Sequence, residues 1–288
     1  MKQVNAKQHN KKFLESKPRD ALRYILRSDK KKYKDAKSKL RKDIQLLDNA
    51  LALYIQALQD SHRRVDEWKD NESLRAAMAM ADSVLHHLLL ARYGVLRGYN
   101  PEVQGFLRAC YERIARCFIF SQNANIAHTY LSGETIQQSE IDRKFRDILE
   151  SKAPDIWVWL RTFYDLQSDH AHPNLKSLNV RTGGSQSVEL ETRVGAEHLF
   201  NIPWDQNYGK AGIHLVMTYA MLSLSIISHV VKIEDADKWR GELNRIASEW
   251  SEKWDTLSDI VPPDLRDKEL SNVSSRYSYW ESKKKKRR

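Results

Sequence analysis

Glycine and proline are scarce in this chain, which has ten glycines and seven prolines among 288 residues. An all-β fold of this length needs many tight turns, and those turns depend on glycine and proline. Long stretches in which apolar residues lie three and four apart favour helices instead. The length is sufficient to bury a sizeable core. We therefore expect an all-α fold, arranged as a multi-helix bundle.

The clearest helix is predicted over residues 31–68, where apolar residues recur at steps of three and four. These residues are Leu40, Ile44, Leu47, Leu51, Tyr54 or Ile55, Leu58 and Val65. At 1.5 Å per residue this helix would extend about 50 Å, longer than a compact domain of this size needs. We expect its lysine-rich start, residues 31–39, to project beyond the body. The length of the stripe also predicts a homo-oligomer.

Further helices are predicted over residues 20–27, 72–97, 100–122, 139–150, 155–168, 210–232 and 237–260. Gly98 ends the second of these, and Asn100-Pro101 is a typical start for the next. Leu88 and Leu89 are expected on the inward side of the 72–97 helix. The 210–232 segment has no charged residue between its ends and is long enough to span a bilayer. Its histidines, serines and threonine favour a core helix, and we expect no membrane partner.

One β signal stands out from this pattern. Residues 178–181 and 188–193 alternate apolar with polar residues around Gly183-Gly184, which predicts a small inserted β-hairpin over about 178–194. The resulting organisation has three parts. Residues 1–18 form a basic flexible arm, residues 19–263 a helical domain, and residues 264–288 a polar tail that ends in a Lys/Arg run.

Positive charge is concentrated at the two ends of the chain. Residues 1–42 contain sixteen Lys/Arg and four Asp/Glu, a net charge of +12, and the last six residues add +6. Because the whole chain carries +10, residues 43–282 carry −8. A polyanion should therefore bind at the ends. We expect a nucleic acid, RNA rather than DNA, and the predicted phosphate contacts are Lys283, Lys284, Lys285, Lys286, Arg287 and Arg288.

Cysteine usage and the first residues indicate the compartment. Cys110 and Cys117 lie seven residues apart in one predicted helix, about 10 Å along its axis, which is too far for a mutual disulfide. Both are expected to be buried, as in a reducing compartment. The first residues contain no apolar segment of the kind found in a secretory signal. We expect a cytoplasmic protein.

The chain contains no phosphate-binding glycine loop, no GxSxG and no zinc-type Cys/His spacing, so we expect neither a cofactor nor a metal ion. One polar constellation is Arg108, Glu112 and Arg116, spaced by four on a single helix face. It is either an exposed ionic ladder or, because Gly105 and Ala109 would let another helix approach, a polar cleft.

The second constellation is His170 and His172 beside Asp169, where a predicted helix ends. Three interpretations remain open. The histidines cap the helix, they act as acid and base near neutral pH, or they bind a metal with a third ligand that no spacing in the sequence identifies. We predict that the Arg108–Glu112 side faces His170 and His172 and forms one polar pocket with them.

Together these elements resemble a known pattern. Leu107-Arg108 to Glu112 gives LRxxxE, and Tyr164, Ser168 and His172 give YxxxSxxxH. This order resembles an uncharacterised, mostly bacterial all-helical family that is loosely grouped with HEPN-like proteins. The resemblance covers roughly residues 75–235. HEPN-like ribonucleases cleave RNA without metal through Arg-x4–6-His, and only Arg193 and His198 match that spacing, which chance would produce.

The resemblance implies a HEPN-like protein that binds or cleaves RNA, in anti-phage defence or in a toxin–antitoxin pair. It would be a metal-independent ribonuclease if it is an enzyme, which the sequence leaves open. In that case Arg108, Glu112, His170 and His172 are the catalytic candidates, with arginine holding a phosphate and histidine moving protons. The alternative is a non-catalytic adaptor that binds protein partners through its long N-terminal helix and its tryptophan-rich last helix.

Overall fold

The computed structural model describes residues 18–98, 100–152, 160–161, 164, 206–254, 278–279 and 282. The helices of these residues are α2 (Pro18–Lys39), α3 (Arg41–Arg63), α4 (Val65–Trp68), α5 (Glu72–Arg97), α6 (Asn100–Gln122), α7 (Ala124–Leu131), α8 (Gln138–Lys152), α12 (Gln206–Val230) and α13 (Ala236–Trp254). No strand occurs among the described residues, and the all-α prediction is confirmed for them. The predicted hairpin at 178–194 lies outside them.

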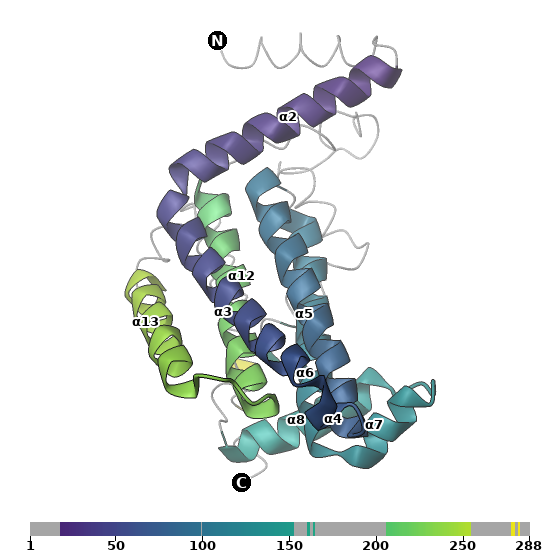
Figure 1. Ribbon diagram of the computed structural model, residues 1–288. Coiled ribbons are helices and arrows are strands. Elements are labelled where there is room, and N and C mark those ends of the chain that lie inside the picture. The colour runs from purple at the N-terminus through teal and green to yellow at the C-terminus, as the bar shows by residue number, and fades with distance from the viewer. Residues whose placement is uncertain are drawn as a thin grey trace.

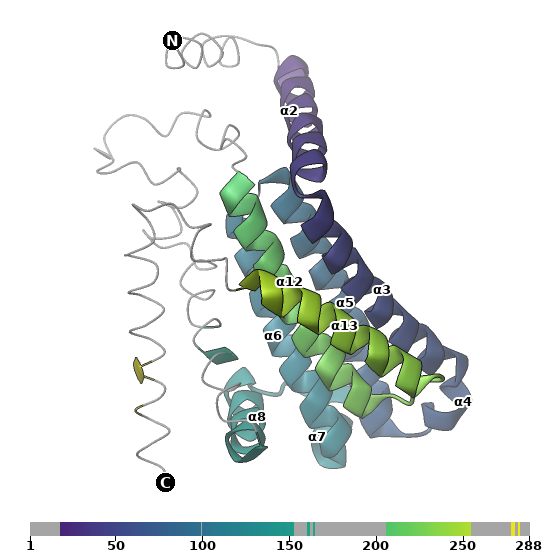
Figure 2. The same cartoon turned by 90° about the vertical axis from the view of Figure 1, so that its left-hand side faces the viewer.

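The helices form a bundle around α12 (Figure 1). Helices α5 and α6 follow each other with almost no linker and pack side by side along most of their length. Helix α12 packs against α3, α5 and α6, and α13 lies on the outer side of α3. Helix α8 packs on α6 (Figure 2), and α7 lies at the end of the α5–α6 pair.

Helix ends follow the local signals where such signals exist. The Asn71 side chain accepts a hydrogen bond from the Leu74 N–H at 3.1 Å, and this cap begins α5. Gly98 ends the same helix with φ 79, in the left-handed region that glycine adopts without strain, as predicted. Helix α7 was not predicted, although it too begins with a capping asparagine, Asn123, which accepts from the Ile126 N–H at 3.1 Å.

The prediction of one continuous helix over residues 31–68 is wrong at Leu40. That residue adopts φ −112 and ψ 25, which separates α2 from α3. The chain changes direction there, and α2 crosses the end of the bundle instead of extending α3 (Figure 1). The bend is favoured because it buries Leu40 to 1% exposure and Ala36 to 0%. Helix α2 also begins earlier than expected, at Pro18, and so includes the separate helix predicted over residues 20–27.

Helix α12 lies in the core of the bundle, as predicted for residues 210–232. Among the described helices it alone contains a segment long and apolar enough to cross a membrane, Gly209–Val230, and 61% of that segment is buried inside the bundle. Its closest approach is at Gly212, where an added Cβ would lie 2.9 Å from Val95 Cγ2 of α5. The absence of a side chain at Gly212 therefore allows the two helices to pack closely.

The apolar stripe of α3 is covered by the chain itself. Leu40, Ile44, Leu47, Leu51 and Leu58 are all 5% exposed or less. The Trp239 Nε1–H of α13 donates to the Leu53 carbonyl at 3.1 Å and fixes α13 on this helix. The stripe therefore no longer requires a second copy to cover it.

Two residues expected on the inward side are exposed instead. Leu89 is 43% exposed and Val65 is 41% exposed. Leu89 and Tyr93 border a shallow groove of about 400 Å³ between α3 and α5, whose floor includes Leu51 and whose edge carries the ion pair of Arg92 with Asp48.

Candidate functional site

Helix α6 carries the first predicted constellation on the side that faces α8. Arg108 Nε donates to Glu112 Oε1 at 3.1 Å, one turn along the helix. The side chains are 26% and 23% exposed, respectively. The pair is therefore neither the exposed ladder nor the enclosed cleft of the sequence analysis, because water reaches only part of each side chain. Arg116, the third member, makes no ion pair with any other described residue.

Tyr164 links the two sequence elements. Its hydroxyl donates to Glu112 Oε1 at 3.3 Å, so one carboxylate oxygen accepts from both Tyr164 and Arg108. The guanidinium carbon of Arg108 lies 5.5 Å from the centroid of the Tyr164 ring. These contacts join residues 52 positions apart in the chain. The structure thus brings the first residue of YxxxSxxxH onto the arginine and glutamate of LRxxxE.

A second ion pair lies beside the first. Arg161, one turn before Tyr164, donates to Asp142 Oδ2 of α8 at 3.3 Å. Gln138 donates to the other oxygen of Asp142 at 2.9 Å. The Arg161 guanidinium carbon lies 4.9 Å from the centroid of the Tyr164 ring. Two arginines therefore approach one aromatic ring, and a carboxylate balances each of them.

Tyr111 forms the floor of this group. Its ring centroid lies 4.5 Å from that of Tyr164, and the residue is 0% exposed. Its hydroxyl has no hydrogen-bond partner among the described residues. A buried hydroxyl without a partner is uncommon in folded proteins and usually has a specific explanation. We use the name polar cluster for Arg108, Glu112, Tyr164, Arg161, Asp142 and Tyr111.

Burial dominates the electrostatics of the polar cluster. It raises the pKa of Tyr164 above its ordinary value of 10.0, and the neighbouring Glu112 charge acts in the same direction. It also raises the pKa of Asp142 above 3.8, against the opposing effects of Gln138 and Arg161. Burial raises the pKa of Tyr111 as well. Tyr111 and Tyr164 therefore stay protonated at neutral pH, and Tyr164 acts as a hydrogen-bond donor rather than as a base.

The other predicted site residues lie outside the described residues. These are His170, His172 and the run Lys283, Lys284, Lys285, Lys286, Arg287 and Arg288. Their predicted roles and the pocket with Arg108 and Glu112 remain predictions. The two cysteines are free and buried, as predicted. Burial raises the pKa of both thiols, that of Cys117 to about 12, so neither is a thiolate nucleophile at neutral pH.

Sequence reasoning did not identify Asp142, Arg161 or Tyr111 as site residues. Tyr164 was quoted only as part of the resemblance. In the described parts of the chain, no group of three or more His, Cys, Asp or Glu side chains is arranged to hold a metal ion. Two exposed histidines instead pair singly with carboxylates, His62 with Asp82 at 3.0 Å and His128 with Glu72 at 2.8 Å.

The polar cluster combines groups that suit an anionic ligand. Arginine binds phosphate through planar, charge-assisted hydrogen bonds. Carboxylates beside the arginines hold the guanidinium groups in position while water still reaches them. Comparison of the chain with models of protein families, with curated proteins and with solved structures gives no match in any of the three.

Proposed function

We propose that the chain is a HEPN-like protein that binds RNA at the polar cluster and cleaves it there without a metal ion. The observation that carries this proposal is the shared oxygen of Glu112, which accepts from both Arg108 and Tyr164. Tyr164, the first residue of the second sequence element, therefore meets the first element at one carboxylate. A cytoplasmic location belongs to the same proposal, whereas the homo-oligomer remains a prediction that the covered stripe of α3 no longer supports.

The proposed chemistry assigns one task to each group. Arg108 contacts a phosphate of the RNA, and Glu112 holds the guanidinium in the required orientation. Tyr164 positions the chain segment that continues to the histidines. Tyr164 and His170 are six positions apart, so their Cα atoms lie within about 22 Å of each other in any conformation. His170 and His172 then transfer protons to and from the reacting oxygens.

The test is cleavage of labelled RNA by the purified full-length chain in the presence of a metal chelator. We expect cleavage by the unchanged protein. His170→Ala and His172→Ala should each reduce the rate by about 10²- to 10⁴-fold, the usual contribution of a general acid or base. Arg108→Ala should weaken RNA binding as well as cleavage.

Arg116→Ala is the matched control, because Arg116 lies on the same helix as Arg108 but makes no ion pair with the other described residues. Its rate should stay within about twofold of that of the unchanged protein, well below the effect of losing an acid or base. If the unchanged protein binds RNA without cleaving it, the cluster is a binding site only. If it does neither, the proposal fails and the adaptor function becomes the better explanation.

A further inference from the structure

Helix α2 carries the net positive charge of the described helices. It contains nine Lys/Arg and three Asp, a net charge of +6. The three long described segments that follow are neutral. Residues 41–98 contain eight Lys/Arg and eight Asp/Glu, residues 100–152 contain seven of each, and residues 206–254 contain six of each. Of the −8 that the sequence assigns to residues 43–282, −2 comes from residues 43–98, because Arg41 and Lys42 lie before that range, and −6 comes from residues outside these three segments.

The cations of α2 are arranged in a line. At 100° per residue, six of them fall within an arc of about 80° on one side of the helix. We call this set the α2 stripe, and its members are Arg19, Arg23, Arg27, Lys30, Lys34 and Lys37. All six are exposed. The three aspartates of the helix fall outside this arc, and the stripe extends about 27 Å along the axis.

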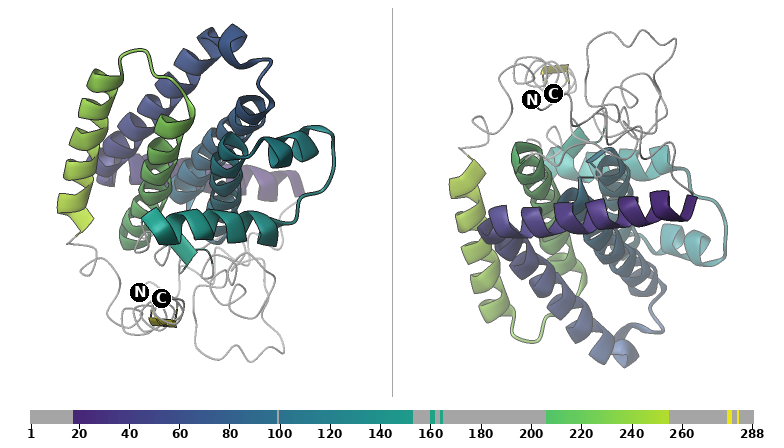
Figure 3. Two further views of the ribbon diagram at one scale, coloured as in Figure 1. Left: turned by 90° about the horizontal axis from the view of Figure 1, so that it is seen from below. Right: turned by 90° about the horizontal axis from the view of Figure 1, so that it is seen from above.

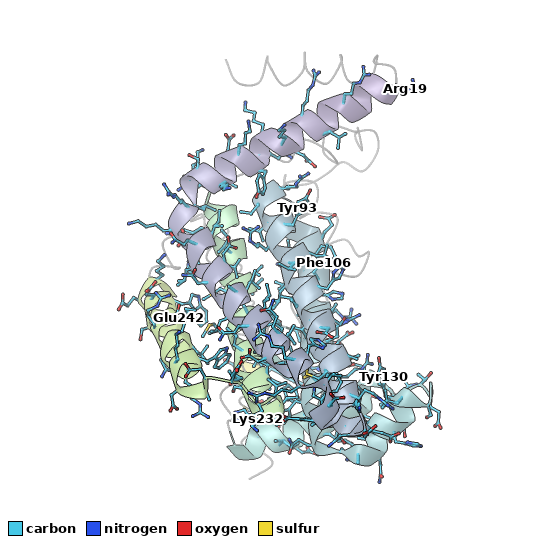
Figure 4. All side chains as sticks on the ribbon, viewed as in Figure 1. Arg19, Tyr93, Phe106, Tyr130, Lys232 and Glu242 are labelled. Atoms are coloured by element: carbon cyan, nitrogen blue, oxygen red, sulfur yellow. The ribbon has the colours of Figure 1, made fainter. Side chains whose placement is uncertain are left out.

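Another side of α2, about 100° around the helix from the middle of the stripe, attaches it to the bundle. Asp29 is 6% exposed, and its carboxylate accepts from Arg97 of α5 at 3.2 Å. Tyr33, one turn further on, lies beside Arg92, which binds Asp48 of α3 through two nitrogens. These contacts fix the rotation of α2 about its axis, so the α2 stripe points away from the body. Figure 3 shows α2 lying across the end of the bundle, and Figure 4 labels Arg19 at its outer end.

Helix stability does not explain such a stripe. Its members are three or four residues apart, and like charges at these separations destabilise a helix. Arg19 and Arg23 also lie near the N-terminal end, where the helix dipole disfavours cations.

We propose that the α2 stripe binds the phosphate backbone of a nucleic-acid duplex without reading its sequence. A row of about 27 Å matches about eight base pairs at 3.4 Å per pair. A rigid row loses less entropy on a stiff duplex than on a flexible strand, which has to be ordered along it. Its six members are all lysine or arginine, so the α2 stripe offers no aromatic ring on which the bases of a single strand could stack. A row of such cations along a duplex contacts its phosphates, and phosphate contacts carry no sequence information.

This inference rests on the proposed function only in its choice of nucleic acid as the partner. The α2 stripe and the polar cluster are separate surfaces, so variants can distinguish them. The measurement is binding of the full-length chain to labelled duplex DNA, duplex RNA and single-stranded RNA between about 50 and 200 mM salt. Vesicles of phosphatidylserine and phosphatidylcholine serve as the membrane alternative.

The test variant combines Lys30→Gln, Lys34→Gln and Lys37→Gln. Six phosphates neutralised by the α2 stripe should contribute about −5 to the slope of log K against log salt for duplex DNA, and losing three of these contacts should make the slope less steep by about 2.7. Affinity near 100 mM salt should drop by more than about tenfold. The charge-preserving variant with Lys→Arg at the same three positions should bind like the unchanged protein.

The control variant removes the same number of exposed cations elsewhere, by Arg143→Gln, Lys232→Gln and Lys238→Gln. It should bind duplexes within about twofold of the unchanged protein, because none of its positions belongs to a continuous row. Equal losses in the control and test variants would contradict the proposal. Tighter binding of single strands than of duplexes, or stripe-dependent binding of the vesicles but not of duplexes, would also overturn it. Failure of RNA cleavage alone would affect only the polar cluster.

Discussion

At the scale of single residues, Glu112 is the centre of the polar cluster, because it accepts hydrogen bonds from two helical segments. Removing it leaves a partly buried guanidinium without this carboxylate. The side chains of Arg108 and Glu112 are 26% and 23% exposed. Losing Glu112 should therefore cost less stability than losing one member of a fully buried ion pair.

We therefore expect Glu112→Ala to lower the free energy of unfolding by about 1–3 kcal/mol. Urea denaturation measures this loss, and Arg116→Ala is the comparison on the same helix. If both variants lose the same free energy of unfolding, Glu112 stabilises the fold no more than an ordinary surface residue does.

Tyr111 and Tyr54 provide a second comparison of single residues. The Tyr111 hydroxyl has no partner among the described residues, whereas the equally buried Tyr54 hydroxyl donates to the Ala81 carbonyl at 3.1 Å. Tyr111→Phe should therefore raise the free energy of unfolding by about 1 kcal/mol, since it removes an unsatisfied buried group. Tyr54→Phe should lower it by about 1 kcal/mol or more. Denaturant titrations that give both variants the same sign would refute this assignment.

The candidate site was predictable from the sequence only where it is local. The Arg108–Glu112 pair follows from a spacing of four on one helix. Tyr164 was quoted in the resembled pattern, but its contact with Glu112 depends on how the segment carrying it packs on α6. The Arg161–Asp142 pair likewise joins two separate segments, and no periodicity within either one specifies their register.

At the scale of helices, the ends of α5 agree with the bounds predicted from the sequence, whereas α7 was missed although Asn123 caps its start. Asn71 and Gly98 delimit α5 because each satisfies backbone groups that the helix leaves unpaired. Leu40 gives no such signal. Its departure from helical geometry is compensated by burial against other helices, which only the assembled bundle provides.

The contact between α12 and α5 can be tested with two glycines. Gly212→Ala places a methyl group 2.9 Å from Val95 Cγ2, and a buried valine has little freedom to move away. We expect a loss of about 1–3 kcal/mol despite the better helix propensity of alanine. Gly241→Ala in α13 has open space around the new methyl group and should gain up to about 1 kcal/mol. Thermal unfolding of the two variants should shift in opposite directions, and adding Val95→Ala should partly restore Gly212→Ala.

Helix α12 also contains a histidine whose burial makes stability depend on pH. Burial lowers the pKa of His214 below 6.5, with Lys210 and Lys253 acting in the same direction and Asp43 against it. As pH falls below 6.5, the unfolded chain gains a proton before the folded one, so this contribution to stability is complete above 6.5 and declines below it.

We expect His214→Leu to reduce the loss of stability that the unchanged protein shows between about pH 7.5 and 5.5. Urea titrations at the two pH values measure it. A variant that retains the full pH dependence of the unchanged protein would contradict the assignment to His214.

At the scale of the whole molecule, affinity for nucleic acid should divide between α2 and the residues at the end of the chain. Replacing Lys283–Arg288 with six glutamines removes six cations. For duplex DNA this should make the salt dependence of log K less steep by up to about 5. The melting temperature should change little, because exposed surface substitutions usually do. Unchanged salt dependence would show that these six cations do not contact phosphate.

The bend at Leu40 separates charge as well as helices. Because α2 crosses the end of a bundle whose other described segments are neutral, the described part of the protein has a dipole moment directed toward that end (Figure 1). In the field of a polyanion, such a molecule rotates before it makes contact and arrives with α2 first. This orientation acts over about 10 Å at 0.1 M salt, the screening length of the solution. A straight helix would have carried the same residues along the axis of α3, so the bend determines which end of the protein meets its partner first.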